Sequence, residues 1–385
     1  MAISAKQNFK KIPLIKPDLP SFQDLEDCFR EVFENGKVTN FGKYVTEFER
    51  EMSRYLGAMT ITVSSGTMAL MFTLQALGIK PGQKVIVPSF TFMATAQAIC
   101  YSGGIPVFAE VGEQLTLSPI DLEQLLELHP DVFAVIPVHL YGLPCEVEKI
   151  KNVIERHESK KGSQIHLVYD AAHAFGASRN GVRVGNFGDA EVFSLSVTKA
   201  LAAVEGGVVA SHNTELIERI KSMRNYGIGE KYDTYGPGLN GKLSELHAIV
   251  GLNNLKNLDE ILLTRKDKAA YFQTQIEEKT AFRLVPMPDN AIHTFKDFTV
   301  IVPAPLKEKR NQIMSFLAEQ GIETRAYFYP PVHEQRFFKR YSDRPLPLTE
   351  DYSRRVITLP FFTSISETEV DYMTEQLIQA EKNCS

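Results

Sequence analysis

The sequence predicts an α/β fold with a mostly parallel sheet covered by helices, followed by a smaller α/β domain. From residue 60 onward, short apolar runs typical of strands alternate with stretches typical of helices. Such alternation favours parallel strands joined by helices that pack on the faces of the sheet. A chain of 385 residues can bury two separate cores. We therefore expect a large domain with N-terminal helices over residues 1–250 and a smaller C-terminal domain over residues 251–385.

The first part of the large domain is predicted to be helical. Apolar residues recur at helical spacing from Phe22 to Phe33, and Gly36 is a suitable stop. A second helix is expected over residues 44–55, after a turn at Asn40-Phe41-Gly42. These helices precede the first expected strand.

Nine short apolar runs are predicted to be strands. In the large domain they are residues 60–63, 84–87, 106–109, 132–138, 165–169, 190–193 and 207–210. In the smaller domain they are residues 294–302 and 324–327. A long charged helix after Gly251 is expected to lead from one domain into the other.

Composition argues against several function classes. The formal net charge of −5 and the lack of a concentrated basic run argue against a nucleic-acid surface. No apolar stretch approaches the roughly 20 residues that a membrane helix needs. The first residues lack the apolar segment of a secretory signal, so a cytoplasmic location is expected. The four cysteines have neither metal-site spacing nor the density of a disulfide scaffold, so no metal is expected.

The segment from Ser194 to Lys199, followed by Glu205-Gly206-Gly207, places one amine after small and hydroxyl residues. A lone lysine is usually a solvated charge, and a glycine pair is usually a turn. Asp170, however, ends an earlier apolar run, at the edge where open α/β sheets bind ligands. An amine that forms a Schiff base needs a lowered pKa, and an electron-accepting pyridine ring needs a carboxylate at its nitrogen. Lys199 and Asp170 therefore predict a pyridoxal phosphate site.

Three other positions could complete such a site. Ser65-Gly66-Thr67 stands between a strand and a helix, where free N–H groups can bind a phosphate, although these hydroxyls could equally cap the helix. Phe92 follows another strand and could stack on a flat ring or pack in the core. His173 could reach the phenolic oxygen of the cofactor or serve as a cap.

Several motifs recur together in the order typical of one family. They are Ser65-Gly66-Thr67, Pro88-Ser89-Phe90-Thr91-Phe92, Asp170-Ala171-Ala172-His173, Thr198-Lys199 with Glu205-Gly206-Gly207, Asn240 with Ser244-Glu245, and Tyr329-Pro330-Pro331-Val332-His333. Nearly the whole chain, from Val38 to Pro360, resembles the DegT/DnrJ family of nucleotide-sugar aminotransferases. The resemblance implies the fold type I architecture of pyridoxal phosphate enzymes.

The resemblance also implies catalytic roles. Lys199 would bond to the cofactor and then move protons between the cofactor and the substrate carbon. Asp170 would pair with the pyridine nitrogen, Phe92 would stack on the ring, and His173 would lie near the phenolic oxygen.

The phosphate of the cofactor would be held by Ser65, Gly66, Thr67 and Ser194. Asn240 would reach the phosphate from the neighbouring subunit, so the resemblance implies a homodimer with shared sites.

Two positions depart from the family pattern. Ser196 stands where many relatives carry a histidine or tyrosine beside the sugar, which makes the substrate pocket less predictable. Lys242 replaces a common arginine, so a cation remains without its planar fork. The family places Tyr329 and His333 near the active site, where they would contact the substrate, although a purely structural loop is an open alternative.

The expected reaction is a two-step transamination between small molecules. L-Glutamate would convert the cofactor to pyridoxamine phosphate, and the C4 keto group of a nucleotide-linked 4-keto-6-deoxy sugar, with a thymidine diphosphate (dTDP) carrier favoured, would accept the amine. The 4-amino-4,6-dideoxy product would serve surface polysaccharide (lipopolysaccharide O-antigen) or glycoside biosynthesis. Glu205-Gly206-Gly207 is similar to the C4 version of the motif, and Ala200-Leu201-Ala202 does not match the C3 version. A C3-specific sugar aminotransferase, a cyclitol aminotransferase and a non-catalytic regulatory protein remain alternatives.

Overall fold

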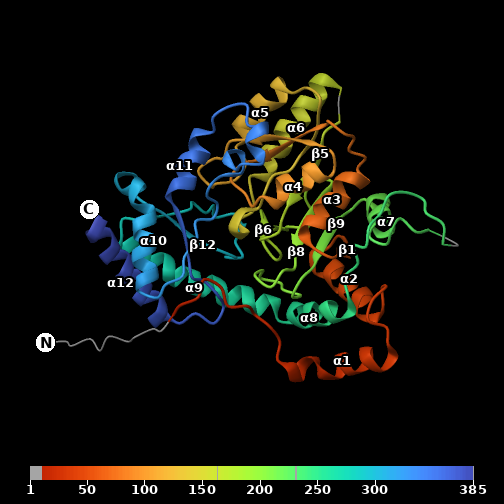
Figure 1. Cartoon of the computed structure of the whole chain (residues 1–385), viewed down its shortest axis with the longest axis horizontal. Helices are drawn as coiled ribbons and strands as arrows, with labels where there is room; N and C mark the ends of the chain where they lie inside the picture. The colour runs from red at the N-terminus through yellow and green to blue at the C-terminus, as the bar shows by residue number, and fades with distance from the viewer. Residues whose placement is uncertain (1–10, 163, 230–231, 385) are drawn as a thin grey trace.

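The computed structural model describes residues 11–162, 164–229 and 232–384, and a seven-stranded sheet lies at its centre (Figure 1). The strand order is β1-β9-β8-β5-β4-β2-β3. The strands are β1 (Met59–Val63), β2 (Lys84–Pro88), β3 (Ile105–Ala109), β4 (Val132–Val135), β5 (His166–Asp170), β8 (Ala190–Ser194) and β9 (Gly207–Ser211). Only β9 runs antiparallel to its neighbours, β1 and β8. The predicted mostly parallel sheet is confirmed.

Helices cover both faces of this sheet. One face packs against α3, α4 and α7, and the other packs against α2 and α8 at one end and α5 and α6 at the other. Their bounds are α2 (Lys43–Leu56), α3 (Gly66–Ala76), α4 (Ala94–Tyr101), α5 (Pro119–Leu128), α6 (Val147–Lys161), α7 (Thr214–Met223) and α8 (Glu245–Lys256). In β5, Val168 lies in the first of these cores and Tyr169 in the opposite one. Burial on both faces explains why the strands read as continuous apolar runs.

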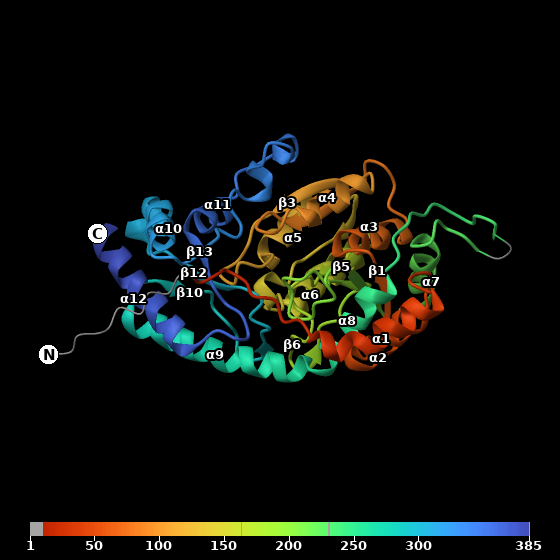
Figure 2. The same cartoon turned by 60° about the horizontal axis from the view of Figure 1, so that its bottom comes forward.

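A second, three-stranded sheet follows in the chain, with order β10-β12-β13. Its core includes side chains from α9, α10 and α12. The 22-residue helix α9 runs from beside α8 to this second sheet, as Figure 2 shows. The elements are α9 (Leu258–Lys279), β10 (Arg283–Leu284), β12 (Phe298–Ile301), α10 (Arg310–Glu319), α11 (Pro347–Arg355), β13 (Val356–Leu359) and α12 (Glu367–Cys384). Ile12, near the N-terminus, packs in the same core.

A third, small sheet has the order β11-β6-β7. Its strands are β6 (Ser178–Arg179), β7 (Val182–Arg183) and β11 (Ala291–Ile292).

No helix in the described ranges is both long enough and apolar enough to cross a membrane.

Three expected strands differ from the structure. The run 132–138 ends as a strand at Val135, and the run 294–302 is a strand only from Phe298 to Ile301. The prediction of a strand over 324–327 is wrong, because Arg325 makes only an isolated bridge to Thr358. The chain then turns, with Tyr329 N–H donating to the carbonyl of Ala326 at 2.8 Å.

The N-terminal helices are α1 (Phe22–Asn35) and α2, as expected. A buried carboxylate accepts hydrogen bonds from backbone N–H groups at the start of α2. Glu245 is 1% exposed and accepts backbone N–H groups from Gly42 at 2.8 Å and Tyr44 at 2.7 Å. A carboxylate is stabilised by the free N–H groups and positive dipole of a helix start. A side chain at Gly42 would collide with this carboxylate, at 2.7 Å from its carbon.

Candidate active site

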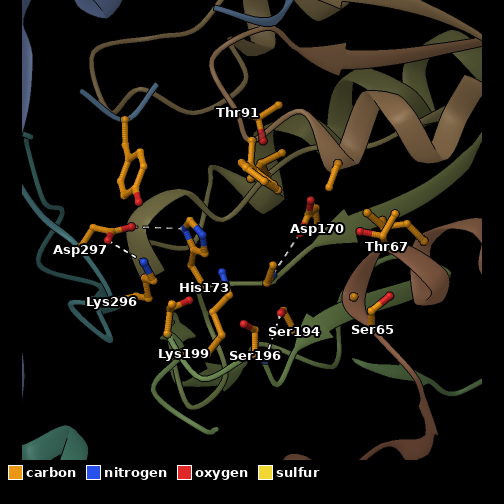
Figure 3. A pocket seen from close by; sticks show the side chains of 18 of the residues that line it. Ser65, Thr67, Thr91, Asp170, His173, Ser194, Ser196, Lys199, Lys296 and Asp297 are labelled. Atoms are coloured by element: carbon orange, nitrogen blue, oxygen red, sulfur yellow. Dashed lines mark hydrogen bonds and ion pairs between the residues drawn. The ribbon is translucent and has the colours of Figure 1, made fainter. Parts of the chain in front are cut away.

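The ends of β1, β2, β5 and β8 open onto a cavity of about 360 Å³ (Figure 3). The polar residues that follow or close these strands line it: Ser65, Thr67, Thr91, Asp170 and Ser194. Carboxyl ends of strands are where open α/β sheets bind ligands. The C-terminal part of the chain contributes one wall, with Lys296, Asp297, Tyr327 and Phe328.

Asp170 closes β5 and is 6% exposed. Its Oδ2 accepts a hydrogen bond from Thr95 Oγ1 at 2.7 Å, and its Oδ1 accepts one from Ala172 N–H at 3.0 Å. Burial raises the pKa of this carboxyl, while the two hydrogen bonds and the nearby charge of Lys199 counter that rise. The carboxylate is therefore held in one orientation and would be stabilised further by a cationic partner.

Lys199 lies in the loop after β8 and lines the same cavity. The residue as a whole is only partly buried, yet protein surrounds its amine, and this desolvation together with the charge of Lys296 lowers its pKa to about 7. The structure shows no hydrogen bond or ion pair to this amine from any described residue. An unpartnered amine that is partly neutral near pH 7 is what a lysine nucleophile requires.

The start of α3 lies at the end of the cavity opposite Lys296 and Asp297 (Figure 3). Ser65 Oγ caps the helix by accepting from Met68 N–H at 3.2 Å, so the capping alternative is correct for this hydroxyl, while Ser65, Gly66 and Thr67 also line the cavity. The first N–H groups of a helix have no intrahelical acceptor and favour an anion. Ser194 faces this end of the cavity (Figure 3).

His173 is neutral in this setting. Its Nδ1 accepts from Tyr141 N–H at 3.1 Å, so the ring proton is on Nε2. Burial, with the charges of Lys199 and Lys296, holds its pKa well below the usual range. His173 lines the cavity and can therefore offer an N–H donor there.

The two phenylalanines of the 88–92 motif have different positions. Phe90 is fully buried, whereas Phe92 is 51% exposed and lines the cavity. Core packing therefore applies to Phe90, and the ring of Phe92 is available to a flat ligand.

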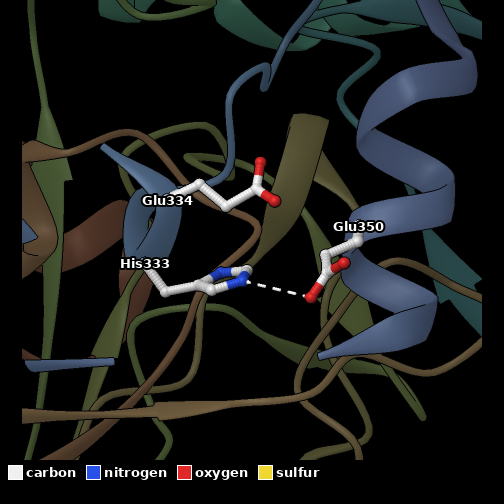
Figure 4. Close-up of side chains that lie close together, drawn as sticks. All are labelled: His333, Glu334 and Glu350. Atoms are coloured by element: carbon white, nitrogen blue, oxygen red, sulfur yellow. Dashed lines mark ion pairs between the residues drawn. The ribbon is translucent and has the colours of Figure 1, made fainter. Parts of the chain in front are cut away.

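Four predicted residues do not line the cavity. Lys242 Nζ contacts Asn225 Oδ1 at 3.3 Å, and the exposed Tyr329 lies against Arg310, whose guanidinium carbon is 4.4 Å from the ring centroid. His333 is buried, with Nδ1 2.6 Å from Ser89 Oγ and Nε2 3.6 Å from Glu350 (Figure 4). Asn240 is exposed. Substrate or phosphate contacts by these residues stay predictions, whereas Ser196 does line the cavity.

The sequence reasoning missed Thr95, Lys296 and Asp297. Thr95 follows the recognised 88–92 motif by only three residues, and its role depends on a hydrogen bond to a residue 75 positions later. Lys296 and Asp297 precede a strand of the second sheet and carry no local pattern that distinguishes them from surface charges.

The chain is similar to known aminotransferases over most of its length. Residues 23–378 match the model of the DegT/DnrJ/EryC1/StrS aminotransferase family. The chain belongs to this family. Its enzymes use pyridoxal phosphate, so the chain is a pyridoxal phosphate-dependent aminotransferase of fold type I.

Three curated relatives are similar over most of their length. A GDP-perosamine synthase from Vibrio cholerae is 30% identical, with 93% of this chain and 96% of the relative covered. A dTDP-4-amino-4,6-dideoxy-D-glucose transaminase from Escherichia coli is 29% identical, with 96% and 99% covered. A dTDP-3-amino-3,6-dideoxy-alpha-D-galactopyranose transaminase from Aneurinibacillus thermoaerophilus is 32% identical, with 92% and 94% covered. Among solved structures, DesI in the presence of its TDP-sugar product has a TM-score of 0.89 and 28% identity, with 97% of this chain and 94% of DesI covered.

The lining residues fit pyridoxal phosphate. The start of α3 offers free N–H groups and hydroxyls to a phosphate, Asp170 offers a carboxylate to a protonated ring nitrogen, and Lys199 offers an unpartnered amine. When bound, the cofactor withdraws electrons from the carbon that carries the transferred amino group.

Proposed function

We propose that this aminotransferase moves an amino group from L-glutamate to the C4 keto group of a nucleotide-linked 4-keto-6-deoxy sugar, with dTDP as the favoured nucleotide. The product would be a 4-amino-4,6-dideoxy sugar for surface polysaccharide or glycoside synthesis. The observation that carries the proposal is the unpartnered Lys199 amine in a cavity that also contains the buried Asp170 carboxylate.

Lys199 acts as the general acid and base of both half-reactions. Its amine removes the proton from the α-carbon of glutamate and, in the second half, delivers a proton to the former keto carbon of the sugar. A pKa of about 7 gives similar amounts of acid and base forms at neutral pH, which is the optimum for a group that must do both. Thr95 and Ala172 keep the Asp170 carboxylate in place during both steps.

The nucleotide-sugar class is supported by the relatives. Their names include a dTDP-linked 4-amino product, a GDP-linked sugar and a dTDP-linked 3-amino product. Glu205, which lines the cavity, begins the glycine motif that resembles C4 enzymes. Amination at C3 is the second candidate, favoured by the 32% identity to the 3-amino transaminase.

The test is to incubate the enzyme with L-glutamate and a panel of nucleotide-linked 3-keto and 4-keto sugars and to determine the product by NMR. We expect an amine at C4 of a dTDP sugar, with no product from Lys199→Ala. A 3-amino product, or no product from any keto sugar while glutamate still changes the cofactor absorbance, would overturn this substrate assignment.

We also propose a homodimer in which Asn240 completes the site of the neighbouring subunit. Its exposure and its absence from the lining of its own cavity support this arrangement, within the described part of the chain. The test mixes Lys199→Ala subunits with Asn240→Ala subunits, and each variant is expected to have little or no activity alone. Because one site in each mixed dimer would regain both residues, activity should return to about a quarter of the wild-type value after random mixing. No recovery from mixed dimers would refute the shared site.

A further inference from the structure

A buried ion pair forms part of the cavity wall opposite the start of α3. Lys296 Nζ and Asp297 Oδ1 are 2.7 Å apart, and the two residues are 6% and 5% exposed. Both line the cavity, immediately before β12, and Figure 3 shows them beside His173 and Lys199. Neither residue is among the site residues predicted from the sequence.

The hydrogen bonding of this pair is incomplete. Among the described residues, Asp297 Oδ2 has no hydrogen-bond partner, and the neutral ring of His173 lies beyond hydrogen-bond distance, with its Nδ1 3.9 Å from Oδ2. The ammonium of Lys296 carries three donors, and a single hydrogen bond, to Asp297, is found for it in the described ranges. Burying two charges is costly unless their remaining hydrogen bonds are satisfied. An incompletely bonded pair beside a cavity is therefore suited to a ligand that supplies the missing partner.

Transamination presents this wall with two different ligands. An amino-acid donor carries a carboxylate, which needs a cation, whereas the reacting ring of a keto sugar is uncharged. The cavity lining contains the lysines Lys199 and Lys296 and the neutral imidazole of His173. Because Lys199 acts as the general acid and base, Lys296 is the lysine of the lining that remains available to bind the carboxylate.

We propose that Lys296 binds a carboxylate of the amino-acid donor, and that Asp297 neutralises Lys296 while the sugar occupies the cavity. Lys296 can thus bind the carboxylate of the donor in the first half-reaction. In the second half-reaction, when the sugar brings no carboxylate, Asp297 keeps the buried Lys296 paired. The role of Asp297 rests on the proposed uncharged sugar acceptor, whereas the role of Lys296 requires only an amino-acid donor.

The test measures binding of glutarate, an unreactive dicarboxylate, to the holoenzyme by calorimetry, together with the KM for glutamate in the first half-reaction. Lys296→Met should weaken glutarate binding and raise the KM for glutamate, each at least tenfold, which is the loss expected for one charge-assisted hydrogen bond. Lys296→Arg should retain most of the binding. Asp297→Asn should tighten glutarate binding severalfold, because the competing carboxylate is gone.

The matched control is Lys84→Met, which breaks a Lys–Asp pair of 3.0 Å at the far end of β2 and should change neither value. Unchanged glutarate binding in Lys296→Met, or weaker binding in both Lys296→Met and Asp297→Asn, would overturn the inference. These readouts do not depend on the sugar. If glutarate behaves as expected but no keto sugar is aminated, the proposed function fails and the carboxylate site stands.

Discussion

Strand β9 and the start of α3 approach so closely at Gly207 that a methyl group has no room. A Cβ at this position would lie 2.2 Å from the carbonyl oxygen of Ser65 and 2.7 Å from the nitrogen of Gly66. Ordinary contacts begin at about 3.4 Å, so Gly207→Ala requires the two segments to separate by about 1 Å. Because the obstacle is backbone, no side chain can rotate away.

We expect Gly207→Ala to lower the free energy of unfolding by about 1–3 kcal/mol, the usual cost of overpacking. For 385 residues the entropy of unfolding is about 0.8 kcal/mol/K, so the melting temperature would fall by only about 1–4 °C. Cofactor affinity is the sharper assay, since the displaced helix start would hold the phosphate. Each 1.4 kcal/mol lost there weakens binding tenfold, and we expect the Kd for pyridoxal phosphate to rise about 10- to 100-fold.

Gly112→Ala is the matched control. Nothing lies within 4 Å of a Cβ at Gly112, and its backbone conformation is open to other residues. This variant should keep both the stability and the cofactor affinity of the wild type. Wild-type cofactor affinity in Gly207→Ala would refute the claim that the helix start holds the phosphate in this position.

Three further changes test the site and the fold. Lys199→Ala should abolish turnover. In the wild-type apoenzyme, the rate of cofactor capture should rise with pH through about 7 and then level off, because only the neutral amine reacts. A rate that still increases towards pH 10 would contradict the lowered pKa of Lys199. Thr95→Val removes a 2.7 Å hydrogen bond to Asp170 and should raise the pKa of this carboxyl further and lower kcat about tenfold; an unchanged kcat would contradict this role. Glu245→Gln should cost about 1–3 kcal/mol in urea unfolding, because an amide cannot accept N–H groups at both of its ends, whereas the exposed Glu47→Gln on α2 should cost nothing measurable.

Much of the fold could be predicted because its signals are local. Runs buried on both faces of a parallel sheet are short and apolar, and all seven strands of the central sheet were found from such runs. The composition of residues 324–327 suits a strand, which is why one was expected there. The prediction was wrong because only Arg325 pairs with a neighbouring segment, at Thr358. Pairing depends on where the neighbouring strand ends, which no local pattern records.

The candidate site divides in the same way. Asp170 and Ser194 close strands, and Ser65 precedes a helix, so their positions in the sequence already place them at one edge of the sheet. Lys296 and Asp297 lie immediately before β12 of the second sheet, and nothing in the neighbouring sequence relates them to Lys199.

By itself, the sequence determined the class of fold and singled out Lys199 and Asp170 as candidate site residues, since local patterns of apolar and small residues mark strand ends and helix starts. The tertiary structure alone decided which charges surround that lysine, and that His333 bonds to Ser89 instead of lining the cavity. The physical reason is that desolvation and Coulomb interactions depend on distances in space. Burial and the nearby charge of Lys296 lower the pKa of the Lys199 amine, and Lys296 contributes only because folding brings the residue before β12 and the loop after β8 into one cavity.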